Sequence, residues 1–242
     1  MINRLPARST IWLVLLAMLA GTITVFRFAE RPEPVSSWSA ASEPQQPPQM
    51  AVPPVPVVSD TPLSNRIVEY HISVQLDAVH KQLNGAQALT WKNPGARPVN
   101  ELYFHLYPNA FKSKQTTFIR ESGGKLREDK MQDNSFGHMA IESIQTEEGV
   151  DLTGTMQFVQ PDDGNKQDET LMKVRLPQPV HPGQTTTVKI RFSVKLPRVF
   201  ARMGYADDFV MAGQWFPKIA VYEPKGTRGR EEEGWNLHQY HG

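Results

Sequence analysis

Two histidines near the C-terminal end have the spacing in this sequence that best suits a shared metal ion. His238 and His241 are three residues apart in the string HQYH, so one helical turn would place both imidazoles on one side. A zinc site also needs a third ligand and a fixed backbone, and residues next to a chain end are usually frayed. We therefore predict no metal site here. The remaining histidines lack ligand spacing, and we expect them to be solvated on strands or in loops: His71, His80, His105, His138 and His181.

A short acidic loop holds Asp162, Asp163 and Asp168. Carboxylates of this kind bind calcium in many proteins, but the full EF-hand spacing is missing here. Acidic residues are common in turns. We therefore expect a solvated turn rather than a calcium site.

The familiar catalytic motifs are absent from the sequence. It contains no H-E-x-x-H zinc-protease motif, no G-x-S-x-G nucleophile elbow and no phosphate-binding G-x-x-x-x-G-K-S/T loop. The count of cysteines is 0, which excludes a thiol nucleophile, a disulfide framework and Cys-based metal sites. We therefore expect no catalytic, metal-binding or cofactor-binding residue in this chain.

An aromatic string, Gln214-Trp215-Phe216-Pro217 followed by Tyr222, is the most unusual local feature. Large aromatic residues are usually buried, and proline removes a backbone donor, so packing at a sheet corner is the favoured interpretation. The alternative is a contact with a ligand or another domain, made by Gln214, Trp215 and Tyr222.

The charge balance argues against a nucleic-acid partner. The chain of 242 residues carries 26 basic and 25 acidic residues, for a formal net charge of +1. The basic residues form no long run that could neutralise a phosphate backbone. We expect no nucleic-acid binding.

An uncharged apolar run from Ile11 to Phe26 predicts a membrane anchor. As a helix it would be about 24 Å long, and extension to Ala29 adds only Arg27, whose stem can reach the headgroups. Basic residues precede the run and mixed charges follow it, which favours a cytoplasmic N-terminus and an extracytoplasmic body. A cleaved signal peptide is the main alternative, although an A-x-A-like cleavage site is missing; a buried core helix is the other.

A proline-rich segment follows from residue 30 to residue 65 and shows almost no hydrophobic periodicity. Proline favours extended conformations, so this segment predicts a spacer that holds a folded body away from a bilayer.

Hydrophobic alternation with period two predicts an antiparallel β-protein after the linker. In residues 187–196 the apolar residues alternate strictly with charged and polar ones, and residues 67–77 show the same pattern. Turn signals at Asn93-Pro94-Gly95 and His181-Pro182-Gly183 predict type II turns, and residues 111–139 predict a long excursion from the sheets. Weaker strand candidates lie at 86–91, 102–107, 140–144, 156–159 and 171–176.

A series of strings resembles bacterial M1 zinc metallopeptidases of the aminopeptidase N type. In order, they are YHISVQLDAVHKQLNG, LTWKN, ELYFHLYPNAF, LPQPVHPGQTTTVKIRFSVKLP, GQWFPKIAVYEPKG and GWNLHQYHG, and they extend over Ile67 to Gly242. The resemblance implies the family's saddle-like N-terminal β-sandwich domain, which precedes a zinc-binding catalytic domain. It also implies that Gln214 corresponds to a glutamine near the amino terminus of the substrate.

This sequence lacks the G-x-M-E-N and H-E-x-x-H motifs that the family places after the matched region. The resemblance therefore transfers no catalytic residue and implies zinc only in a full-length relative. The matched region also ends before the last strands of the family's N-terminal domain, so we expect this domain to be incomplete.

Together these patterns predict an all-β chain, an antiparallel β-sandwich preceded by one N-terminal transmembrane helix. The expected parts are an anchor (1–29), a linker (30–65) and a sandwich domain (66–242). The expected function is that of a non-catalytic domain that contributes substrate or domain contacts, with the membrane and a catalytic M1 domain or a peptide as partners. The alternative is an autonomous, membrane-tethered β-sandwich module that binds peptides or a partner protein.

Overall fold

A computed structural model describes residues 12–14, 65–126 and 128–241 of the chain. Most of the predicted anchor and of the predicted linker therefore lies outside the described residues. Contacts divide the chain into two compact units, residues 1–25 with 67–242 and residues 26–66.

One short piece of the predicted anchor region is described. It is strand β1 (Trp12–Val14), which pairs in parallel with β12 (Phe209–Ala212). Within the described ranges, no helix is long and apolar enough to cross a membrane.

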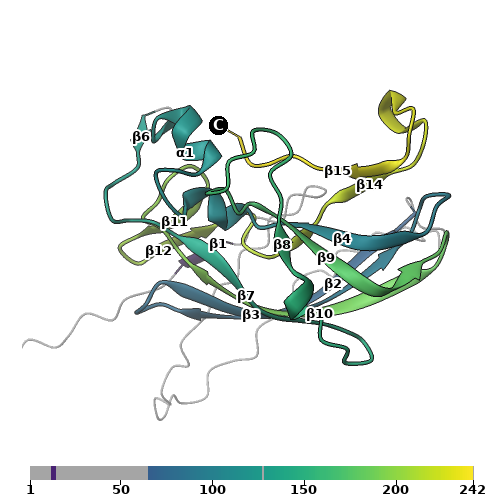
Figure 1. Ribbon diagram of the computed structural model, residues 1–242. Helices are drawn as coiled ribbons and strands as arrows, with labels where there is room; N and C mark the ends of the chain where they lie inside the picture. Colours follow the sequence, from purple (N-terminus) through teal and green to yellow (C-terminus); the bar gives the residue numbers. More distant parts are fainter. Residues whose placement is uncertain (1–11, 15–64, 127, 242) are drawn as a thin grey trace, which may run out of the picture. The chain divides into compact units, whose positions relative to one another are not determined.

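Two four-stranded antiparallel sheets form the body of the larger unit (Figure 1). The first, which we call the β10 sheet, has the order β2-β3-β10-β7. The second, which we call the β4 sheet, has the order β13-β4-β9-β8. Their strands are β2 (Val68–Asp77), β3 (Gln82–Lys92), β10 (Thr185–Lys195), β7 (His138–Thr146), β13 (Lys218–Ile219), β4 (Val99–His105), β9 (Leu171–Val180) and β8 (Gln157–Phe158).

Shorter elements complete the described part of the chain. The remaining strands are β5 (Lys125–Leu126), β6 (Asp129–Lys130), β11 (Met203–Ala206), β14 (Val221–Glu223) and β15 (Gly234–Asn236). The helices are η1 (Tyr107–Phe111), α1 (Thr117–Ser122), η2 (Thr153–Thr155) and η3 (Thr227–Gly229). The predicted excursion at 111–139 thus contains α1 and the β5–β6 hairpin.

Alternation in the sequence explains how the sheets share a core. On β10 the buried residues are Val188, Ile190, Phe192 and Val194, as the period of two predicts. Side chains from β4 and β9 join them in one hydrophobic cluster. Because the described strands are mostly antiparallel and the helices are few and short, the predicted all-β class is confirmed, and the two packed sheets are consistent with a β-sandwich.

Two of the connections between the sheets, from β3 to β4 and from β9 to β10, contain the predicted type II turns, and the structure confirms one of these predictions and not the other. At His181-Pro182-Gly183 the glycine has φ of 75°, and Gln184 N donates to His181 O over 3.0 Å, which confirms the predicted type II turn. The prediction for Asn93-Pro94-Gly95 is wrong, since Gly95 does not have positive φ. Gly95 is needed for a different reason: a Cβ there would lie 2.6 Å from Cε1 of Tyr222.

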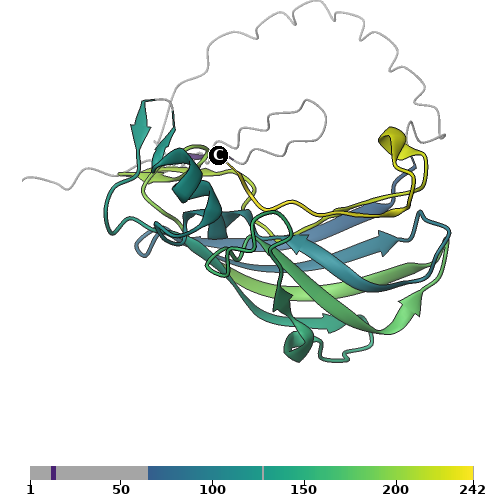
Figure 2. The ribbon, with the colours of Figure 1, turned by 45° about the horizontal axis from the view of Figure 1, so that its top comes forward.

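Strand β15 and the chain after it run along the outer face of the β4 sheet (Figure 2). Trp235 contacts Tyr103 of β4, with ring centroids 5.8 Å apart, and Tyr240 contacts Tyr107 at 5.2 Å. This segment covers side chains that point away from the core.

Candidate functional site

Two of the three predicted contact residues are buried in the core. Trp215 retains 7% of its exposure and packs against Phe192, with ring centroids 6.1 Å apart. Tyr222 also retains 7% and lies between Trp91 and Trp235, at 6.0 and 5.2 Å. Packing at the sheet corner accounts for both residues.

Gln214, the third, is half-buried and has an unusual backbone conformation. Its φ is 55°, in the left-handed region that a residue other than glycine adopts only at an energetic cost. The Lys218 ammonium donates a hydrogen bond of 2.7 Å to Gln214 Oε1. This hydrogen bond fixes the direction of the Gln214 side-chain amide.

Two side chains from the β10 sheet hold the segment that follows Gln214. The buried Gln87 Nε2 donates to Pro217 O over 2.9 Å, and Ile219 N donates to the Tyr70 hydroxyl over 3.0 Å. Burial raises the pKa of Tyr70 to about 12, so its hydroxyl stays neutral. Residues 214–219 are therefore held against both sheets.

His105 faces this segment from β4, directly opposite Lys218 in the strand register. Its ring stacks on Tyr107, with centroids 5.0 Å apart and parallel planes. Burial, with the charges of Lys218 and His238, lowers the pKa of His105 to about 4. The expectation of a solvated His105 is therefore wrong, because the segment at 214–219 and the C-terminal segment cover this face of β4.

We call Gln214, Lys218, His105 and Tyr107 the Gln214 patch. Burial lowers the pKa of Lys218, so its ammonium is partly desolvated. Within the described part of the chain, the buried His105 Nδ1 has no hydrogen-bond partner. Because Gln214 Oε1 already accepts from Lys218, the patch presents donors, and it suits a carboxylate or carbonyl oxygen better than the ammonium group that the resemblance would assign to Gln214.

The half-buried His105, with its lowered pKa, predicts a measurable loss of stability in mild acid. Below pH 6.5 an unfolded chain binds a proton on this imidazole that the folded chain does not bind until about pH 4, so the free energy of unfolding falls between these values. Protonation of His105 is expected to lower the free energy of unfolding by about 3 kcal/mol over this pH range. Urea unfolding at pH 7 and pH 4 will show that His105→Gln removes this part of the decline.

The exposed His71, whose side chain keeps 76% of its exposure, provides the matched control. His71→Gln is expected to leave the acid-induced decline as large as in the unmodified chain. An identical decline in the unmodified chain and in His105→Gln would show that His105 is solvated.

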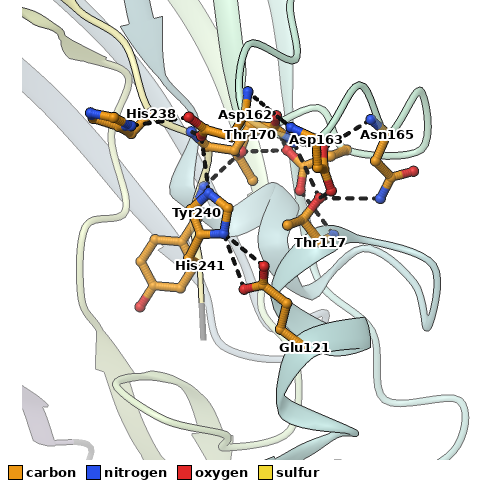
Figure 3. Close-up of polar contacts among 11 residues, drawn as sticks. Thr117, Glu121, Asp162, Asp163, Asn165, Thr170, His238, Tyr240 and His241 are labelled. Atoms are coloured by element: carbon orange, nitrogen blue, oxygen red, sulfur yellow. Dashed lines mark hydrogen bonds and ion pairs between the residues drawn. The ribbon is translucent and has the colours of Figure 1, made fainter.

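A second polar cluster holds the C-terminal segment (Figure 3). Asp162 accepts from Gln239 N at 2.6 Å and contacts His238 Nδ1 and His241 Nε2 at 3.0 Å each. His241 Nδ1 lies 2.9 Å from Glu121 of α1, and the two carboxylates raise the pKa of His241. The expectation of a frayed end is therefore wrong for residues 238–241.

The acidic loop is part of this cluster rather than a solvated turn. Asp168 is fully buried, and its carboxylate accepts hydrogen bonds from Thr117 N and Thr170 N at 3.1 and 3.0 Å. Gln239 Nε2 donates to Asp163 Oδ1 over 2.9 Å. The carboxylates are used by protein donors, and no grouping suited to a metal ion occurs among the residues whose positions are described.

Sequence reasoning missed the burial of His105, although one signal was present. The string LYFHLY has an apolar or aromatic residue at nearly every position, which is typical of a strand covered on both faces. The contacts of Asp162 with residues 238–241 had no such local signal.

Comparisons with known proteins give little to add to this geometry. No family model matches the chain. No curated protein matches it. Among solved structures, a CBM3a-L domain with flanking linkers from scaffoldin cipA of the cellulosome of Clostridium thermocellum is similar, with a TM-score of 0.28 and 11% identity over 70% of this chain and 89% of that chain. A similarity of this size carries no argument.

Proposed function

We propose that this chain is the non-catalytic N-terminal domain of a membrane-anchored protein that resembles M1 zinc aminopeptidases, with the family's saddle-like sandwich and an extracytoplasmic body. On this proposal the chain is inert as a peptidase by itself and contributes contacts to a catalytic domain or to the substrate. Zinc would belong to the catalytic domain.

One observation carries the proposal. Three of the strings that resemble the family are far apart in the sequence and meet at the Gln214 patch. GQWFPKIAVYEPKG supplies Gln214 and Lys218, and ELYFHLYPNAF supplies His105 and Tyr107. GWNLHQYHG supplies Tyr240, whose ring contacts Tyr107 at 5.2 Å.

The donors of the patch indicate what the contact would be. A carbonyl or carboxylate oxygen of the adjoining domain can accept from Lys218, whose partly desolvated ammonium strengthens such a bond. The neutral His105 ring lies beside it.

The coding sequence downstream of codon 242 provides the test. We expect it to encode H-E-x-x-H, and we expect that polypeptide, expressed separately, to bind the chain and to release p-nitroaniline from leucine p-nitroanilide with zinc. Lys218→Ala is expected to weaken the association about 10-fold, because it removes a charge-assisted hydrogen bond. Lys195→Ala, on the outer face of the β10 sheet, is the matched control. Chelator-sensitive hydrolysis by the chain alone, or the absence of the motif downstream, would contradict the proposal.

A second candidate function is an autonomous, membrane-tethered binding module. It is favoured by the distribution of exposed large hydrophobic residues, which lie on separate loops and strands of the described chain: Val74, Val79, Val150, Phe158, Val199, Phe209 and Val221. A sandwich domain that lacks its last strands would instead expose a continuous apolar edge on one of its sheets. Light scattering and circular dichroism on residues 60–242 distinguish the two, since a module is monodisperse and unfolds cooperatively.

A further inference from the structure

The outer face of the β10 sheet contains a hollow that the proposed function does not use. Strand register places eight side chains in two neighbouring rows that cross all four strands. The first row is His71, Ala88, Lys189 and Gln145, and the second is Ser73, Ala86, Arg191 and Ser143. These residues line a hollow of about 480 Å³, which we call the Arg191 trough.

The trough is positively charged and contains no carboxylate. Each row has one cation in its middle, on β10. Lys189 Nζ reaches only a backbone carbonyl, that of Glu147 at 3.4 Å, and in the described part of the chain the Arg191 guanidinium has no hydrogen-bond or ion-pair partner. Three acidic groups border the trough: Glu69 pairs with His71 over 3.0 Å, Asp151 is bridged to Gln145 at the other end of the first row, and the pKa of Glu148 is lowered by a hydrogen bond with Thr146 and by the charge of Lys189.

Ala86 and Ala88 are small residues beside the two cations, and the stability of the sheet does not explain why alanine occupies these positions. Alanine is depleted in strands, and an exposed sheet face usually gains stability from larger cross-strand pairs. Here Ala86 and Ala88 stand directly opposite Arg191 and Lys189. Short side chains at these positions, with Ser73 and Ser143, leave room for a backbone to approach the sheet and still reach both cations.

We propose that the Arg191 trough binds an extended acidic peptide segment that crosses the four strands. Three strand spacings give a length of about 14 Å, which is four to five residues of extended chain. Successive side chains of an extended chain point to opposite sides, so carboxylates at neighbouring positions of a segment that runs between the two rows would meet Arg191 and Lys189, which are about 7 Å apart along β10. Hydroxyl and amide groups of Ser73, Ser143 and Gln145 supply donors for its carbonyl oxygens. With only two cations in the trough, a nucleic acid would be a poor fit.

Fluorescence anisotropy of labelled hexaglutamate with the full chain tests this proposal. We expect saturable binding that weakens at least 10-fold in Arg191→Ala and is suppressed by high salt. Ala88→Leu fills the trough without a change of charge, and we expect a similar loss. Lys195→Ala removes one positive charge from the same strand and the same face, outside the trough, and we expect a change of less than 2-fold.

Several results would overturn the proposal that the Arg191 trough binds an acidic peptide. The absence of hexaglutamate binding, equal losses in Arg191→Ala and Lys195→Ala, or unchanged binding in Ala88→Leu would each exclude a shaped site. Binding of phosphatidylserine vesicles that depends on Arg191 and is not reduced by hexaglutamate would assign the trough to a membrane surface instead. The downstream polypeptide and Lys218 play no part in this assay, so its outcome is independent of the proposed function.

Discussion

Asn93→Ala is expected to lower the free energy of unfolding by about 3 kcal/mol and the Tm by about 6 to 12 °C. Asn93 is 1% exposed at the end of β3. Its side-chain nitrogen donates to Arg97 O and Val180 O over 2.8 and 2.9 Å, and its Oδ1 accepts from Gly95 N over 2.9 Å. Alanine leaves these buried groups without partners, at a cost of about 1 kcal/mol or more each.

The position of Asn93 explains why the loss is large. Val180 ends β9, and the chain then enters the type II turn toward β10, whereas Arg97 lies in the connection from β3 to β4. One side chain therefore joins two of the connections between the sheets, the one from β3 to β4 and the one from β9 to β10. The backbone bonds of Asn93 with Gly183 and Gln184 remain in the variant, so local opening at this end is expected rather than a different fold.

Asn84→Ala on the same strand is the matched control. Asn84 is exposed, and its side chain accepts only from Gln82 Nε2 over 2.8 Å. We expect a change within about 0.5 kcal/mol, as is usual at exposed positions. Urea unfolding of both variants measures the difference, and equal stabilities would show that Asn93 does not join the connections.

Residues whose environment is set by local periodicity could be predicted from the sequence. The inward face of β10 follows from alternation alone, and Gly183 follows from the requirement of a type II turn. Both depend on neighbours within a few residues. Gly95 shows the limit, because the atom that excludes a side chain there belongs to Tyr222.

The candidate site could be predicted only in part, because its deciding contacts also come from residues that are remote in sequence. Gln214 was identified from its string, but His105, which lies opposite Lys218, comes from another strand, and the burial of His105 results from segments more than a hundred residues later. The contact between Asp162 and His241 is equally remote in sequence. Such contacts depend on the strand order of the sheets, which a single sequence does not specify.

Gly85→Ala is expected to destabilise the chain by about 2 kcal/mol, although replacement of a strand glycine by alanine ordinarily stabilises. Gly85 lies opposite Phe192 in the register of β3 and β10. A Cβ at Gly85 would lie 2.4 Å from Phe192 Cζ and 2.8 Å from both Cε atoms. Phe192 is 1% exposed and packs on Trp215, so its ring has no free space into which to move.

A double-mutant cycle with Phe192→Leu separates this clash from any other effect of alanine. Leucine removes the end of the ring, so Gly85→Ala should cost about 1 to 2 kcal/mol less in that background. Gly154→Ala, where a Cβ would meet no atom within 4 Å, is the control and should be neutral or slightly stabilising. A neutral Gly85→Ala in the unmodified chain would contradict the prediction. The expected coupling would show that the Phe192 ring fills the place of a missing side chain on β3, where it also packs against Trp215.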